Sequence, residues 1–357
     1  MKCIPVHEAV GHILYHDITE IVPDKCKGPS FRRGHVVVEA DIPHLLRLGK
    51  ENVYVADAPN CLDTASPETV GAGGTSGKIQ VHEDEAAKRI ATAIAGSGVV
   101  FGEPREGRIN LSAAHPGLLQ INVPLLDRLN SIPDVTIATI HSNQGVVKGR
   151  TLAGTRVIPL SVPEGTVAAV EECCRGEQVL AVLPYKSFQV GIVTTGSEVY
   201  SGRIQDGFGP VLRQKFADVS IPVLGQTIVP DTTAVTVAAI TEMIEAGATF
   251  VVVSGGMSVD PDDKTPAAIR EVADQVIGYG APIFPGAMFM LAYKGTVPIL
   301  GLPGCVMYHR ASIFDILLPR LLAGVHITRH DVIRLAHGGL CEACATCHYP
   351  ACGFGKG

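Results

Sequence analysis

From residue 188 onward, short β-branched runs alternate with segments of helical pattern, and this alternation constrains the fold more than any other feature of the chain. Strand, loop and helix repeated in this order predict a parallel sheet with helices on its faces. The expected strands are 189–193, 221–224, 249–253 and 297–300, and the expected helices are 209–216, 232–245 and 307–322. We therefore predict an α/β fold, a three-layer domain with a mostly parallel sheet, over residues 186–325.

Two glycine-rich loops that end in carboxylates follow two of the expected strands. The first reads Thr194-Thr195-Gly196-Ser197-Glu198, and the second runs from Ser254-Gly255-Gly256 through Ser258 to Asp260, Asp262 and Asp263. Ligands of open parallel sheets bind beyond the carboxyl ends of the strands, so both loops are expected at one crevice. Backbone N–H groups beside fixed negative charges suit a phosphorylated ligand held through a divalent cation. The alternative for either loop alone is a βα turn whose acids cap the following helix.

A third turn, Gly301-Leu302-Pro303-Gly304, follows the strand expected at 297–300. The helix expected after this turn would offer free backbone N–H groups to a phosphate. Asp231, at the start of the helix expected at 232–245, adds another carboxylate near the two acidic loops. The sequence thus predicts that three loops converge on one pocket for an anionic ligand.

Four motifs in this order resemble the molybdopterin-binding domain of molybdenum-cofactor biosynthesis proteins, nearest to the molybdopterin molybdenumtransferase class. They are Thr194 to Glu198, Gly202-Arg203-Ile204-Gln205-Asp206, Ser254 to Val259 leading to Asp263, and Gly301 to Gly304. In the N-terminal part, residues 9–14 look like the opening helix of that class, and residues 33–49 look like the segment that leads back to the binding domain. The resemblance implies that molybdopterin or its adenylate is the ligand, and that Mg²⁺ assists the insertion of molybdate.

The resemblance also implies roles for individual residues. Glu198, Asp231 and Asp263 match the acidic catalytic positions, and Glu198 and Asp263 are the expected Mg²⁺ ligands. The expected contacts to the cofactor are Thr195, Gly196, Ser197, Asp206, Ser254, Gly255, Gly256, Ser258, Pro303 and Gly304. Three departures separate the chain from the transferases: it lacks the Met-Asp-Gly-Tyr-Ala signature, Cys305-Val306 replaces the usual Asn-Pro, and Ser197 replaces an acidic residue. They leave two alternatives open, a non-catalytic molybdopterin carrier or insertion partner for a molybdoenzyme, and a nucleotide pyrophosphate hydrolase.

The C-terminal tail places four thiols within twelve residues, at Cys341, Cys344, Cys347 and Cys352. Their spacing, C-x2-C-x2-C-x4-C, favours a soft metal. A structural zinc would use four sulfurs, or three sulfurs and His348, whereas the compact C-x2-C-x2-C run also resembles the binding motif of an iron–sulfur cluster. The remaining alternative is a disordered, redox-sensitive end without metal.

The rest of the chain is expected to form an N-terminal α+β lobe at 1–60, a mixed α/β scaffold at 61–185, and the Cys-rich tail at 326–357. Local patterns predict a strand at 36–39, helices at 43–48 and 83–95, and a strand at 53–55. The cysteines are expected to be reduced thiols or metal ligands, because we expect a cytoplasmic protein.

Charge and hydropathy exclude two classes of partner. A formal net charge of −6 and a pI near 6.1 provide no basic field for nucleic acid. No stretch approaches the roughly 20 apolar residues of a membrane span, and the first residues lack the apolar core of a secretory signal. We therefore expect no nucleic-acid or membrane partner, and the resemblance implies a homo-oligomer.

Overall fold

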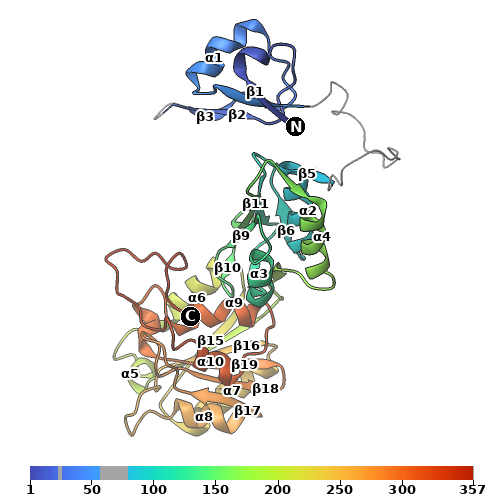
Figure 1. The fold of residues 1–357 in the computed structure, drawn as a ribbon. Helices are drawn as coiled ribbons and strands as arrows, with labels where there is room; N and C mark the ends of the chain where they lie inside the picture. Colours follow the sequence, from blue (N-terminus) through green and yellow to red (C-terminus); the bar gives the residue numbers. More distant parts are fainter. Residues whose placement is uncertain (23–25, 57–78, 357) are drawn as a thin grey trace.

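A six-stranded sheet lies at the centre of the C-terminal domain (Figure 1). The computed structural model describes residues 1–22, 26–56 and 79–356 of the chain. The strands of this sheet are β14 (Val190–Thr195), β15 (Val223–Val229), β16 (Phe250–Ser254), β17 (Gln275–Tyr279), β18 (Met290–Lys294) and β19 (Val297–Leu302). Their order is β15-β14-β16-β19-β18-β17. The first four strands in this order are parallel, and β18 is antiparallel to both of its neighbours.

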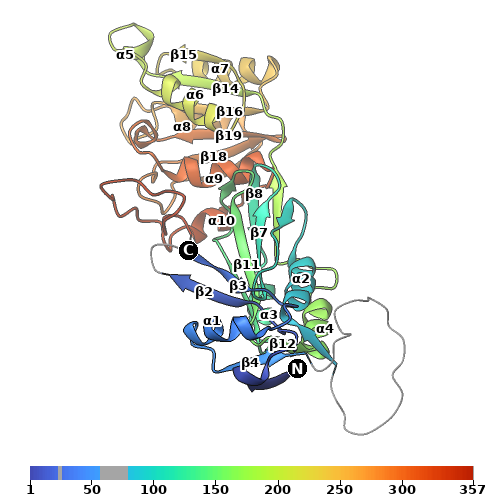
Figure 2. The same ribbon diagram turned by 90° about the horizontal axis from the view of Figure 1, so that it is seen from above.

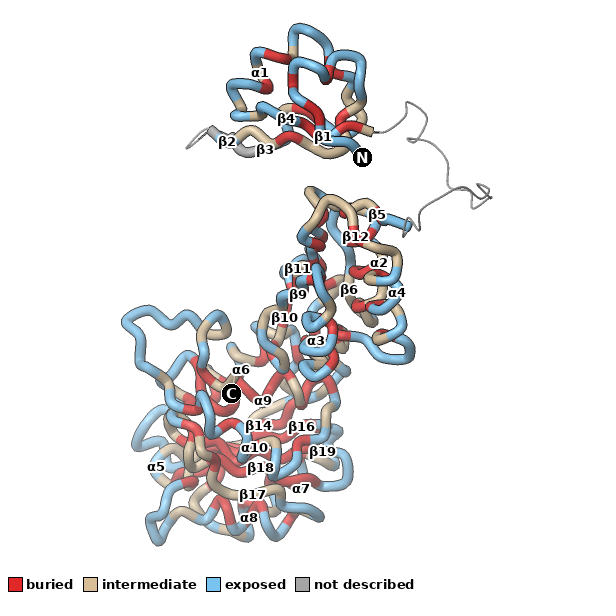
Figure 3. The backbone as a smooth tube through the Cα atoms, in the orientation of Figure 1, coloured by how far each residue is buried: buried red, intermediate tan, exposed pale blue. Residues whose placement is uncertain are grey.

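Helices cover both faces of this sheet and bury two apolar clusters against it. On one face, α6 (Phe208–Asp218) and α9 (Ile313–Leu322) pack on the strands, and on the other face α7 (Thr233–Glu245) and α8 (Thr265–Val272) do so. The four inner strands, β14, β16, β18 and β19, are buried almost throughout, because both of their faces are covered, whereas the edge strands β15 and β17 are more exposed (Figure 3). The predicted three-layer α/β domain is therefore confirmed, and its parallel strands end on a common edge.

The predicted start of the helix at 307–322 is wrong. A 3-10 turn, η3 (Gly304–Met307), follows β19, and α9 begins only at Ile313. The side chain of Asp315 accepts hydrogen bonds from the backbone N–H and the hydroxyl of Ser312, at 2.8 and 3.0 Å, which is a capping box. The N-terminus of α9 is thus closed by its own side chains and does not follow the glycine turn.

A separate apolar cluster fills the middle region between residues 79 and 184. Its elements are β5 (Gln80–His82), α2 (Glu83–Ile94), β6 (Val99–Phe101), β7 (Arg108–Ala113), β8 (Gly117–Ile121), α3 (Val123–Asn130), β9 (Val135–Thr139), β10 (Gly145–Val146), β11 (Thr151–Val157), β12 (Ser161–Pro163), α4 (Glu164–Cys173) and β13 (Leu180–Pro184). The strands form sheets of the order β6-β7-β11-β9, β10-β8-β13 and β12-β5. The helix predicted at 83–95 is confirmed as α2, and the predicted boundary near residue 60 lies outside the described residues.

The N-terminal lobe is a small α+β unit with its own buried cluster. It contains β1 (Lys2–Pro5), η1 (Val6–Glu8), β2 (Ile18–Val22), β3 (Cys26–Phe31), η2 (Glu39–Asp41), α1 (Ile42–Arg47) and β4 (Asn52–Val55). The predicted strand at 36–39 is wrong, because the Asp41 carboxylate accepts a hydrogen bond from the Val38 N–H and stabilises the 3-10 turn there. The opening helix expected at 9–14 is also absent, since Ile13 and Leu14 form β-bridges instead.

The lobe contacts the middle region, and the tail packs on the C-terminal domain. The rings of Tyr15 and His82 meet edge-on, with centroids 5.4 Å apart. Figure 2 shows the lobe beside the middle region in a second view. The tail begins with α10 (Arg329–Arg334) and buries Phe354 in the cluster beneath α9. No helix in the described part of the chain is long and apolar enough to cross a membrane.

Candidate functional site

Loops that follow three parallel strands line one cleft at the carboxyl edge of the sheet. The loops follow β14, β15 and β16, and the cleft has a volume of about 840 Å³. The lining residues are Thr194 to Val199, Ile204 to Phe208, Asp231, Gly255, Gly256, Asp260, Asp262, Asp263 and Met307. Nine residues of the predicted site are among them: Thr195, Gly196, Ser197, Glu198, Asp206, Asp231, Gly255, Gly256 and Asp263. The two glycine-rich loops meet at this cleft as predicted, whereas the predicted turn at 301–304 does not line it.

A reciprocal pair of hydrogen bonds joins the first loop to the loop after β15. The Ser197 backbone N–H donates to Oδ2 of Asp231 at 2.7 Å, and the Asp231 backbone N–H donates to Oγ of Ser197 at 3.2 Å. Ser197 is the first residue of the short helix α5 (Ser197–Tyr200), so Asp231 satisfies one of its free N–H groups. The other carboxylate oxygen, Oδ1, lies toward Gly256 of the second loop. Asp231 therefore fixes the loop after β15 to the first loop and lies near the second.

The glycines of the second loop allow it to approach the first loop closely. Gly255 and Gly256 have φ values of +85° and +56°, in the left-handed region that side chains disfavour. A Cβ atom on Gly255 would lie 2.0 Å from the carbonyl oxygen of Thr195, and one on Gly256 would lie 3.6 Å from Oδ1 of Asp231. The two glycines thus place the second loop directly against Thr195 and near Asp231.

A layer of buried hydroxyl groups supports the cleft from below. Oγ1 of Thr194 lies 3.2 Å from Oγ of Ser254, and Oγ1 of Thr195 lies 3.0 Å from Oγ1 of Thr265. The Gln226 side chain donates to Thr194 Oγ1 at 3.0 Å. Ser254 is fully buried, so the structure places it beneath the cleft, where it links two strands, rather than in the lining.

Asp206 caps a helix at the rim of the cleft. Its Oδ1 accepts from the Phe208 N–H at 2.9 Å, and its Oδ2 accepts from the Gly209 N–H at 3.0 Å and from Gln226 Nε2 at 2.6 Å. A carboxylate with three donors is already well satisfied. Asp206 lines the cleft, and these bonds fix it at the start of α6 instead of presenting it freely to a ligand.

The other acids are more open and do not form a tight cluster. Glu198, Asp260 and Asp262 are exposed, and Asp263 is half-buried. Within the described ranges, no three His, Cys, Asp or Glu side chains converge closely enough to hold a metal ion. Mg²⁺ in proteins is commonly bound through one or two carboxylates together with waters and substrate phosphates. Glu198 and Asp263 both line the cleft, and this mode of binding requires no more than two carboxylates from the protein.

Tyr279 is a residue of the site region that the sequence analysis missed. It lies at the end of β17, and its hydroxyl donates to the carbonyl oxygen of Met257 at 2.8 Å, within the second loop. Burial, together with the negative charge of Asp263, raises the pKa of Tyr279, so this phenol keeps its proton and remains a donor. The guanidinium of Arg270 lies 5.7 Å from the centre of its ring. No local signal in the sequence marks Tyr279, because the contact spans 22 residues.

Three other predicted contact residues lie outside the lining of the cleft. Ser258 is exposed beyond it, Pro303 is buried, and Gly304 is half-buried in η3. Met307, at the end of η3, lines the cleft in their place. The third loop therefore contributes a thioether side chain where the sequence predicted a phosphate-binding turn. The four tail cysteines lie elsewhere and line a second cavity beside α9.

Comparison with protein families assigns the domain that carries the cleft. A family described as "Probable molybdopterin binding domain" matches residues 191–323. Residues 191–323 belong to this family. The molybdopterin-binding domain thus holds all three loops of the cleft, and the family predicted from the four motifs is confirmed. A second family, described as a domain of unknown function, matches residues 3–57 of the N-terminal lobe.

Three similar proteins each match less than half of this chain. A CinA-like protein of Mycobacterium leprae is 37% identical over 79 residues, which are 22% of this chain and 18% of that protein. The aligned segment thus spans less than a fifth of this curated relative. The crystal structure of MoaB from Thermus thermophilus, described as a molybdopterin biosynthesis enzyme, is 24% identical with a TM-score of 0.33 and covers 38% of this chain and 91% of that chain. The Mog protein of Mycobacterium ulcerans is 21% identical with a TM-score of 0.33, covering 38% of this chain and 95% of that chain.

Proposed function

We propose that the chain acts in molybdenum-cofactor biosynthesis, binding molybdopterin or its adenylate in the acidic cleft and assisting Mg²⁺-dependent insertion of molybdate. The observation that carries this proposal is the Ser197–Asp231 pair of hydrogen bonds, which fixes two loops of a molybdopterin-binding domain around one cleft. A second support is the close approach of the Gly255 loop to Thr195. A ligand in this cleft would meet backbone N–H groups and carboxylates together.

In this proposal the backbone binds the phosphate and the carboxylates bind Mg²⁺. The left-handed glycines let the second loop pack against the first, and backbone N–H groups of these loops would bind a phosphate group. Glu198 and Asp263 would hold Mg²⁺, which supplies charge neutralisation and polarisation of a phosphoanhydride when it is bound. Asp231 orients the first loop through Ser197, and it presents its second oxygen toward the Gly256 side of the cleft. In this proposal the loops bind the pterin phosphate by themselves, and catalysis requires bound Mg²⁺ in addition.

A substitution of Asp263 tests this division. We expect Asp263→Asn to reduce Mg²⁺-dependent release of AMP from adenylated molybdopterin by at least about 10- to 100-fold, the loss typical of even indirect partners of a metal site. The fold should remain intact, because Asp263 is half-buried and its carboxylate makes only one long hydrogen bond, at 3.4 Å, to the Asp260 N–H. The matched control is Asp218→Asn, an exposed carboxylate on α6 outside the cleft, which should leave turnover unchanged.

The same assay separates the transferase from the alternatives. AMP release together with metal insertion supports the proposed activity, and undiminished turnover by Asp263→Asn would remove this residue from the site. Tight binding without turnover, with equal affinity in the presence and absence of Mg²⁺, identifies a carrier or insertion partner for a molybdoenzyme. The carrier has one structural argument in its favour, since Asp206 is already engaged as a helix cap. Hydrolysis of unrelated dinucleotides would indicate the pyrophosphate hydrolase.

A further inference from the structure

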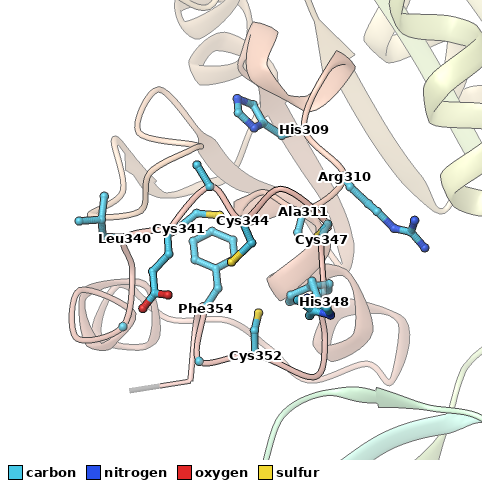
Figure 4. A pocket seen from close by; sticks show the side chains of 15 residues that line it. His309, Arg310, Ala311, Leu340, Cys341, Cys344, Cys347, His348, Cys352 and Phe354 are labelled. Atoms are coloured by element: carbon cyan, nitrogen blue, oxygen red, sulfur yellow. The ribbon is translucent and has the colours of Figure 1, made fainter.

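All four cysteines of the tail line one cavity. The cavity has a volume of about 280 Å³ and lies between the tail and the segment that precedes α9. Cys341, Cys344, Cys347 and Cys352 are free thiols, and each is at least partly accessible. Figure 4 shows their side chains gathered around the loop of the tail, with Phe354 at its centre. Four thiols from one short segment thus share a single enclosed space.

The backbone that carries these thiols is held against the domain. Phe354 is only 5% exposed and belongs to the main apolar cluster. The Tyr349 hydroxyl donates to the carbonyl oxygen of Asp315 in α9 at 3.0 Å. At the start of the motif, the Cys341 N–H donates to the carbonyl oxygen of Phe284 at 2.8 Å. The tail is therefore packed at both ends of the motif, and the alternative of a disordered end does not fit this arrangement.

The described arrangement of the thiols does not match a site for one tetrahedral ion. A structural zinc needs all of its ligands at about 2.3 Å, which brings neighbouring sulfurs to roughly 3.8 Å from each other. In the part of the chain that the structure describes, no three potential ligands approach each other in this way. A four-iron, four-sulfide cluster binds each of four thiolates to a different iron, so its ligands remain farther apart than those of one zinc ion. The four thiols in one cavity, without a close trio of ligands among the described residues, therefore favour a cluster over zinc.

The surroundings of the cavity suit a group of negative charge. Arg310, His309 and His348 line it, whereas Glu342 is the only acid among the described residues of its lining. Lys356 lies close enough to Cys352 for the two to interact electrostatically. Cationic neighbours reduce the repulsion among several thiolates and stabilise the charge of a bound cluster. The apolar side chains of Phe354 and Leu340 shield part of the same space from water.

We propose that Cys341, Cys344, Cys347 and Cys352 bind a four-iron, four-sulfide cluster in this cavity. The cluster enters from a preformed donor by ligand exchange. Four iron–sulfur bonds to the cysteines form while four bonds to the donor's ligands break. The four thiol protons pass to the solvent or to the departing ligands, and no electron is transferred. This inference concerns residues outside the acidic cleft and does not rest on the function proposed for that cleft.

Metal analysis of the full-length chain tests the cluster directly. After anaerobic purification and incubation with a preformed cluster donor, we expect about four irons and about four acid-labile sulfides per chain, with a charge-transfer absorption that bleaches on reduction. Cys344→Ser should lose most of this iron and sulfide. The matched control is Cys3→Ser, another exposed thiol, which lies in the N-terminal lobe and should retain both.

Two results with the unsubstituted chain would overturn the proposal. One is stoichiometric zinc without labile sulfide, and the other is a chain that takes up no iron from the donor while its circular dichroism shows a native fold. Equal iron content in Cys344→Ser and Cys3→Ser would also contradict it, because only the first residue lines the cavity. Circular dichroism of both variants establishes that a loss of iron does not arise from unfolding.

Discussion

The middle region is expected to lose stability as the pH rises, because Glu83 is buried. Replacing Glu83 by glutamine is expected to remove this loss. Glu83 is the first residue of α2 and is only 6% exposed. Burial, reinforced by the negative charge of Asp84, raises the pKa of Glu83 from 4.5 to about 7. Between these two values the folded chain retains a proton that the unfolded chain releases. The contribution of Glu83 to stability is therefore greatest below pH 4.5, falls as the pH rises toward 7, and then becomes constant.

The expected magnitude follows from the two pKa values. The difference between 7 and 4.5, at about 1.36 kcal/mol per pKa unit, corresponds to about 3 kcal/mol. Glutamine has nearly the same shape as the protonated acid and does not titrate. The stability of Glu83→Gln relative to the native chain should therefore increase by about 3 kcal/mol between about pH 4 and about pH 8. At the acidic end, the two proteins should differ little.

Hydrogen exchange at α2 and β7 measures this difference. Both proteins are compared at each pH, so that the pH dependence of chemical exchange cancels between them. Glu85→Gln is the matched control, because Glu85 lies in the same first turn of α2 and is exposed. A protection difference that stays constant across the pH range, or an equal effect of Glu85→Gln, would refute the reasoning from burial.

Two further substitutions test contacts in the molybdopterin-binding domain. Tyr279→Phe removes the hydroxyl that donates to Met257, so we expect faster hydrogen exchange in the second loop and a loss of about 1 kcal/mol, or about fivefold, in ligand affinity by calorimetry. An unchanged affinity would show that Tyr279 does not order the loop. Lys215→Met leaves Asp315 without its cation. The two side chains are 2.5 Å apart and only 14% and 15% exposed. We therefore expect the free energy of unfolding, measured with denaturant, to fall by about 3–5 kcal/mol. A loss below about 1 kcal/mol would mean that the ion pair behaves as a surface pair.

The central strands were predictable because local sequence and tertiary environment agree there. The runs at 189–193 and 249–253 are rich in β-branched residues, and both strands are buried on both faces. Their ends, and hence the two acidic loops, follow within one or two residues. The start of α9 was not predictable from periodicity, since the apolar pattern continues through Met307. The hydrogen bonds between Ser312 and Asp315 set the start of α9, and this capping signal was present in the sequence.

For segments far apart in the sequence, their proximity could be predicted but not their individual contacts. The common edge of parallel strands brings Ser197 and Asp231 near each other, but the sequence does not determine their two hydrogen bonds. Tyr279 comes from the edge of the sheet and has no motif of its own. In the tail, the spacing of the cysteines was evident, whereas the burial of Phe354 depends on the shape of the apolar cluster that receives it. The motifs that carry chemical groups were therefore easier to predict than their positions in the folded domain.

The short stretch between η3 and α9 borders two separate spaces. Met307 at one end faces the acidic cleft, while His309, Arg310 and Ala311 face the cysteine cavity. A small displacement of this stretch would alter the walls of both spaces together. This stretch thus forms a wall of both the cleft proposed to bind a phosphorylated ligand and the cavity proposed to bind a cluster, so we expect occupancy of one to change the free energy of binding in the other.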